Sequence, residues 1–157
     1  MIEQINTYFT TEIIFMWLNL GVLPFWLILI IFPQSQICRV FITSIFPILI
    51  LSITYGYLVN LFFYEGYDFI GNFELYLGLE AVGNLFTYNA FIILFWTHFL
   101  AMNLFCGGWI VKDSQKFGIN KFLISIPLLI TYFVGPMGLT IYWIIRVFYA
   151  KRINLYD

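Results

Sequence analysis

Four apolar runs, each long enough to cross a bilayer as a helix, fill most of the chain between residues 13 and 149. A helix needs roughly 20 apolar residues to cross a hydrocarbon core about 30 Å thick. The chain is 62% hydrophobic and 10% charged, with a mean hydropathy of +0.94, so its polar side chains cannot cover a soluble globule. We therefore predict one transmembrane domain over residues 1–157, an all-α integral membrane four-helix bundle with spans at about 13–32, 40–63, 85–111 and 122–149.

The segments between these runs carry most of the charge. Pro33 ends the first run, because proline lacks a backbone donor and disfavours helix just before itself. Residues 64–82 hold four acidic residues and no basic one, and we expect a polar connection there with a short interfacial helix near 73–82. Residues 112–121 are predicted to form a charged turn.

Charge and cysteine content exclude some functions and leave orientation open. The net charge of -1 provides no basic surface for nucleic acid. Cys38 and Cys106 form no CxxC pair, and we interpret both as small apolar residues. With four spans, the two short turns would carry four basic residues and the opposite side three, so the number of basic residues does not decide the orientation. The early position of Arg39 and the acidic middle loop favour a cytoplasmic location for both short turns.

The third run contains His98, the only histidine of the chain, about 20 Å along the predicted helix. An ionisable residue at bilayer depth is expensive and points to function. Three roles stay open for an imidazole held inside the bundle: a hydrogen bond joining two helices, proton transfer near neutral pH, or contact with a haem or lipid-soluble ligand. A metal site is not predicted, because no second histidine or carboxylate lies at the same depth.

Small and kinked positions surround this residue in the predicted bundle. Gly107 and Gly108 would allow another backbone to approach closely. Pro136, next to Gly135, is expected to kink the fourth span toward the bundle interior, beside a pocket between the third and fourth spans. Tyr55 could supply a hydroxyl at depth, and Arg146 is expected to extend its charge to the membrane surface.

Two segments carry a family resemblance: residues 96–110, WTHFLAMNLFCGGWI, and residues 133–142, FVGPMGLTIY. Together they resemble the membrane domain of the plant abscisic-acid-deficient-four family, which also has bacterial members. The resemblance covers roughly residues 13–149. Seven residues match the family pattern: His98, Gly107, Trp109, Gly135, Pro136, Gly138 and Tyr142. Where the family commonly has aspartate and arginine, this chain has Asn103 and Gly108.

The resemblance implies a role in xanthophyll metabolism. Plastid members are needed to convert violaxanthin to neoxanthin, an isomerisation that opens an epoxide and forms an allene without net redox change. Such a step needs a proton donor at the epoxide oxygen and a base at the adjacent carbon. The candidate catalytic residues are His98, Asn103 and Tyr142. The candidate ligand contacts are Trp96, Trp109, Gly107, Gly135, Pro136 and Tyr55.

Three functions follow as alternatives. The chain could be a carotenoid epoxide isomerase, or a component of one, that holds a carotenoid or similar polyisoprenoid between helices. It could instead be a non-catalytic pigment-binding or scaffold subunit, or a small proton-relay protein. We expect no cofactor and no nucleic-acid partner. Membrane lipid is an expected partner, a homo-oligomer or larger membrane complex stays open, and the expected location is a bacterial inner membrane or a plastid membrane.

Overall fold

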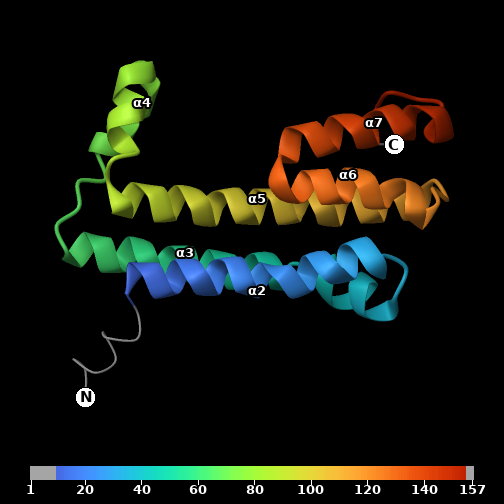
Figure 1. Ribbon diagram of the computed structural model, residues 1–157, viewed down its shortest axis with the longest axis horizontal. Helices are drawn as coiled ribbons and strands as arrows, with labels where there is room; N and C mark the ends of the chain where they lie inside the picture. Colours follow the sequence, from blue (N-terminus) through green and yellow to red (C-terminus); the bar gives the residue numbers. More distant parts are fainter. Residues whose placement is uncertain (1–9, 155–157) are drawn as a thin grey trace. The chain divides into compact units, whose positions relative to one another are not determined.

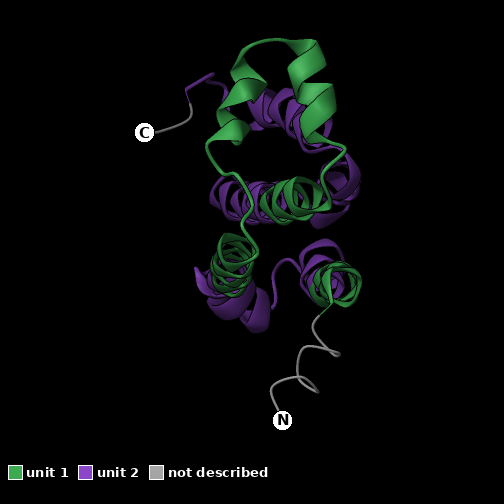
Figure 2. Ribbon diagram, turned by 90° about the vertical axis from the view of Figure 1, so that its left-hand side faces the viewer, with its two compact units in different colours: residues 1–21, 50–100 green, residues 22–49, 101–157 purple. Residues whose placement is uncertain are grey.

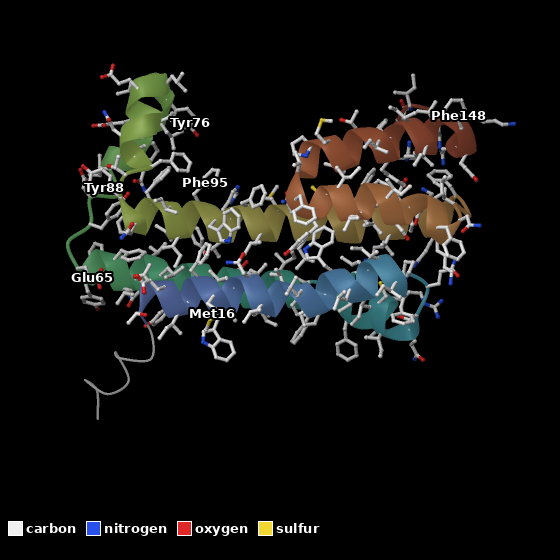
Figure 3. All side chains as sticks on the ribbon, in the orientation of Figure 1. Met16, Glu65, Tyr76, Tyr88, Phe95 and Phe148 are labelled. Atoms are coloured by element: carbon white, nitrogen blue, oxygen red, sulfur yellow. The ribbon has the colours of Figure 1, made fainter. Side chains whose placement is uncertain are left out.

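The computed structural model describes residues 10–154, and within them the regular structure is entirely helical (Figure 1). Three helices are long and apolar enough to cross a membrane: α2 (Thr11–Ile31), α3 (Phe46–Tyr64) and α5 (Asn89–Lys116). They confirm the all-α prediction and agree with a membrane protein. Apolar side chains such as those of Met16 and Phe95 stand exposed along these helices, as expected of surfaces that face lipid (Figure 3).

Two of the connections differ from the predicted boundaries. The second helix begins at Phe46, not near residue 40, because residues Cys38–Ile42 form a separate short π-helix, η1. The acidic connection holds two short helices, η2 (Gly71–Tyr76) and α4 (Leu79–Leu85), in place of one interfacial helix. Gly78 separates them with φ 150°, a backbone conformation that side chains rarely adopt.

The predicted fourth span over residues 122–149 is wrong as a single helix. It is two helices, α6 (Lys121–Phe133) and α7 (Gly135–Ala150), with the break at Val134, whose φ of -141° and ψ of 85° are not helical. Pro136 lies in the first turn of α7, where a missing N–H costs nothing and the fixed φ favours a helix start. The proline therefore begins a new helix and does not kink an existing one.

Helices α6 and α7 pack against each other as a hairpin. Gly138 of α7 lies against Thr131 and the carbonyl oxygen of Pro127 on α6, so the two helices run in opposite directions from the break (Figure 1). At 13 and 16 residues they are about 20 and 24 Å long, each too short to cross a bilayer alone.

The contacts divide the chain into two compact units, each made of separate sequence segments (Figure 2). Unit 1 comprises residues 1–21 and 50–100, and unit 2 comprises residues 22–49 and 101–157. The prediction of a single domain is not tested by this division and stays a prediction.

The hairpin changes how charge is distributed. Because α7 returns to the end of unit 2 at which α6 begins, Arg146 and Arg152 lie beside Phe117, which follows α5. Gln115 also donates to the carbonyl of Pro33 at 2.7 Å, which places the α2–α3 connection at this same end. Lys116, Arg146 and Arg152 thus lie together at one end of unit 2, whereas the four-to-three split placed Arg146 and Arg152 on the side opposite Lys116. Which side of a membrane this end faces stays a prediction.

Candidate functional site in unit 2

A buried polar side chain lies where the hairpin turns. Asn103 on α5 is 6% exposed, and its Oδ1 lies so close to Gly135 that a Cβ at that position would overlap it. Its Nδ2 has no hydrogen-bond partner among the described residues. A buried donor without a partner costs about 1–3 kcal/mol, so this amide is a site where a bound oxygen atom would be stabilised.

A second polar cluster lies ten residues further along α5, about 15 Å toward its C-terminal end. Asp113 Oδ2 accepts from the Tyr142 hydroxyl at 2.6 Å and from Arg146 Nε at 2.7 Å. Arg146 is 1% exposed, and its Nη1 has no partner among residues 10–154. The Tyr142 proton is committed to Asp113, so that hydroxyl can accept a further hydrogen bond but has no second proton to donate.

Aromatic rings enclose this cluster. The Trp109 ring meets that of Tyr142 edge-on at 5.6 Å, and the rings of Phe117 and Trp143 lie 4.9 and 5.2 Å from the Arg146 guanidinium carbon. A guanidinium beside aromatic faces is stabilised by cation–π attraction, which is strongest where water is excluded. Trp109 thus acts as packing for Tyr142 in this arrangement.

The two glycines of the predicted close approach have different neighbours: a Cβ at Gly108 would lie 4.0 Å from the backbone Cα of Thr43, whereas a side chain lies against Gly107. A Cβ at Gly107 would lie 2.8 Å from Trp26 Cη2, so the indole of Trp26 fills that space. Trp26 in turn meets the Tyr132 ring at 5.4 Å, joining α2 to α6. Gly107 therefore serves helix packing within unit 2.

The prediction that His98 faces the bundle interior was wrong. His98 lies in unit 1 on an exposed face of α5, and the structure gives it no hydrogen bond among the described residues. The buried positions beside it on α5 are apolar or internally bonded, as in Thr97, whose hydroxyl donates to the Ile93 carbonyl. Leu94, Thr97 and Leu100 face the core, and this register turns the imidazole outward.

The remaining predicted residues are divided between the two units. Trp96 lies in unit 1, where its indole N–H donates to Asn19 Oδ1 at 3.1 Å and its ring stacks on Phe99. Tyr55, also in unit 1, is 38% exposed. Within unit 2, Asn103 and Gly135 touch, Trp109 and Tyr142 touch, and Pro136 is exposed at the start of α7.

Sequence reasoning missed Asp113 and misplaced Arg146. Asp113 was assigned to a charged turn, but it lies in α5 as its buried acidic residue, and Arg146 does not extend to the surface. A signal was present in the spacing: Arg146 comes four residues after Tyr142, and Asp113 comes four residues after Trp109, so each pair shares a helix face. Among residues 10–154, no group of three histidine, cysteine or acidic side chains could hold a metal ion.

Comparison with known proteins identifies one family. The family described as ABA DEFICIENT 4-like matches residues 13–142, which is 130 of the 157 residues. The match includes Asn103, Gly135 and Tyr142 and ends before Arg146. No curated protein and no solved structure matches the chain.

Proposed function

The chain belongs to the ABA DEFICIENT 4-like family, and from that premise we propose that it binds a carotenoid or similar polyisoprenoid within unit 2. The Nδ2 of Asn103 at the hairpin turn, which has no hydrogen-bond partner within residues 10–154, supports this proposal most directly. A xanthophyll is a long apolar chain with an oxygen atom on its end ring. That oxygen would accept a hydrogen bond from Asn103, while the apolar chain would lie among the lipid-facing side chains of α6 and α7.

Binding without chemical conversion is the form of this function that the residues favour. Epoxide opening needs an acid that gives up its proton, and an amide at position 103 can donate a hydrogen bond but cannot transfer a proton at neutral pH. His98 is exposed and outside unit 2. Tyr142 is bonded to Asp113.

Isomerisation remains the second candidate, because the family resemblance implies it. In that case His98 would serve as donor or base to a ligand lying along the exposed face of α5. The two candidates differ in the pigment that the protein releases: binding alone leaves the pigment unaltered, and isomerisation changes the violaxanthin-to-neoxanthin ratio.

The test is expression in hosts that make different xanthophylls, followed by gentle solubilisation and chromatography of the co-purified pigments. We expect unaltered pigment in stoichiometric amount, and a loss of at least tenfold in Asn103→Leu, which matches the native side chain in size but has no donor. Asn60→Leu, an exposed asparagine on α3, is the matched control and should keep its pigment.

Two further results decide between the candidates. Asn103→Asp restores the residue common in the family, and a new allenic pigment in that variant alone would assign the isomerisation to a proton at this position. His98→Ala should keep both fold and pigment. If the wild type carries no pigment in any host, or if Asn103→Leu and Asn60→Leu retain pigment equally, the proposed binding site is refuted.

A further inference from the structure

The N-terminus of α7 has no side-chain cap. The first N–H groups of a helix have no acceptor within that helix. In α7 the first internal bond runs from the Gly138 N–H to the Val134 carbonyl at 3.2 Å, and Val134, the N-cap residue, has no side-chain oxygen to accept from the groups before it. Pro136 has no N–H. Gly135 and Met137 therefore bring N–H groups that α7 itself does not satisfy.

This end of α7 lies beside the middle of α5. Asn103, whose Oδ1 lies against Gly135, is the fifteenth of the 28 residues of α5 and is about 20 Å from either end of that helix. Because α5 is long enough to cross a membrane, its middle is expected deep in the hydrocarbon region. Lipid tails offer no acceptors, so backbone N–H groups at that depth need one from protein or from a bound molecule.

Asn103 adds a donor that is independent of the helix end. Its side chain is 6% exposed, and its Nδ2 has no hydrogen-bond partner among residues 10–154. The Nδ2 lies 4.0 Å from the point where a Cβ on Gly135 would stand, whereas Oδ1, the acceptor of the same amide, is crowded by Gly135. A side-chain donor and the positive end of a helix dipole thus meet at one place, and both stabilise partial negative charge.

The side chains exposed around this end are apolar. Phe133 and Val134 lie at the break between α6 and α7, Met137 lies in the first turn of α7, and all three are exposed. An occupant would therefore meet the N–H groups with an oxygen atom and these side chains with hydrocarbon. A ligand dissolved in the membrane matches this pattern, and a hydrated ion does not.

Resting on the binding site at Asn103 described above, we propose that the preferred ligand has a conjugated carbonyl oxygen at the end of a polyisoprenoid, as a ketocarotenoid or an isoprenoid quinone has. A carbonyl oxygen has two lone pairs and no proton, so it accepts from Asn103 Nδ2 and from a backbone N–H of α7 together. An alcohol also has a proton that needs an acceptor, and Oδ1 of Asn103 is crowded by Gly135. A buried donor without a partner weakens binding, so the site selects carbonyl over hydroxyl.

The test titrates the detergent-solubilised full chain with canthaxanthin, which carries ketones, with zeaxanthin, which carries hydroxyls, with β-carotene, which carries neither, and with menaquinone-4. Binding is followed by quenching of tryptophan fluorescence. We expect canthaxanthin or menaquinone-4 to bind at least tenfold more tightly than zeaxanthin, and the tighter of the two identifies the source of the carbonyl.

The outcomes separate this inference from the proposed function on which it rests. If zeaxanthin binds as tightly as both carbonyl ligands, and β-carotene more weakly, the carbonyl preference is overturned while the oxygen site at Asn103 stands. If none of the four ligands binds, or if β-carotene binds as tightly as the others, the proposed function fails as well.

The role of the helix end is tested by capping it. A serine at the N-cap supplies an oxygen that accepts from the Met137 N–H, which then competes with the ligand. Val134→Ser should therefore weaken binding of the carbonyl ligand about three- to tenfold relative to Val134→Ala, the value of one hydrogen bond. Val134→Ala is the matched control, because it shortens the same exposed side chain without adding an oxygen. Equal affinities in the two variants would exclude the helix end from the site.

The contact with Asn103 has a spectroscopic signature that altered packing alone would not produce. A hydrogen bond lowers the stretching frequency of a carbonyl, so the infrared band of bound canthaxanthin should move to higher frequency in Asn103→Leu. The ratio of canthaxanthin to zeaxanthin affinity should fall at least threefold in the same variant. Asn60→Leu on α3 should change neither quantity. An unshifted band with an unchanged ratio in Asn103→Leu would overturn the proposal.

Discussion

Replacing Gly138 by alanine should open the α6–α7 hairpin. A Cβ at this position would overlap Thr131 Oγ1 and the Thr131 backbone nitrogen, and would lie 2.6 Å from the Pro127 carbonyl oxygen. Real Cβ contacts essentially never fall below 3.0 Å. Because two of these obstacles are backbone atoms of α6, no side-chain rotation can relieve them, and the two helices must separate.

The magnitude follows from two opposed terms. Over-packing costs about 1–3 kcal/mol, and backbone obstacles place Gly138→Ala at the upper end of that range. Alanine recovers about 1 kcal/mol through its higher helix propensity. We therefore expect a net loss of about 2 kcal/mol in the free energy of unfolding.

Two other glycines calibrate the effect. Gly56 lies within α3 with nothing inside 4 Å of a built Cβ, so Gly56→Ala should gain about 0.5–1 kcal/mol. At Gly135 the obstacle is the Asn103 side chain, which can rotate, so Gly135→Ala should lose less than Gly138→Ala. Adding Asn103→Ala to Gly135→Ala should remove that obstacle.

The assay is reversible unfolding of the detergent-solubilised protein by titration with sodium dodecyl sulfate, followed by circular dichroism. The three glycine variants are compared with wild type under one set of conditions. If Gly138→Ala is as stable as Gly56→Ala, α6 and α7 do not pack at this glycine, and the hairpin argument fails.

Three further predictions follow from the same structure. Asp113→Val should lower the free energy of unfolding by about 3–5 kcal/mol, because it leaves Arg146 as a buried charge without its partner. Adding Arg146→Met and Tyr142→Phe to this variant should restore most of the lost stability. Additive losses in the sodium dodecyl sulfate titration would contradict this prediction. Burial raises the pKa of the Cys38 thiol to about 11. In the Cys106→Ser variant, where Cys38 is the remaining cysteine, the rate of maleimide labelling of Cys38 should therefore keep rising between about pH 9 and 11. A plateau near about pH 9 would indicate an accessible, ordinary thiol. In a cysteine-free background, Lys121→Cys and Lys151→Cys should react with an impermeant maleimide from the same side of the membrane, which the positive-inside rule predicts to be cytoplasmic. Asn89→Cys should react from the opposite side. If Lys151→Cys reacts from the same side as Asn89→Cys, residues 121–150 cross the membrane.

Local properties of the sequence were sufficient for the class of fold. The length and apolar composition of the runs near residues 13–32 and 85–111 predict helices, and α2 and α5 are found there within a few residues at each end. The match to the family over residues 13–142 likewise agrees with the resemblance stated from two short segments. These properties depend on hydropathy and on residue spacing along one chain segment.

Which face of a helix is buried required the tertiary structure. His98 and Asn103 both lie on α5 within an apolar run, yet His98 is exposed and Asn103 is buried beside Gly135. A run that is apolar on every side has no periodic pattern from which its buried face could be predicted.

The sequence by itself determined that this chain is a set of apolar helices with its basic residues near the ends of the apolar runs, because length and hydropathy act locally. Only the tertiary structure decided that residues 121–150 fold back as a hairpin and that Asp113, Tyr142 and Arg146 meet. Proline near Val134 permits either a kink or a new helix, and the choice depends on the packing of Gly138 against α6. Ion pairing between residues 33 positions apart likewise depends on which helices come together.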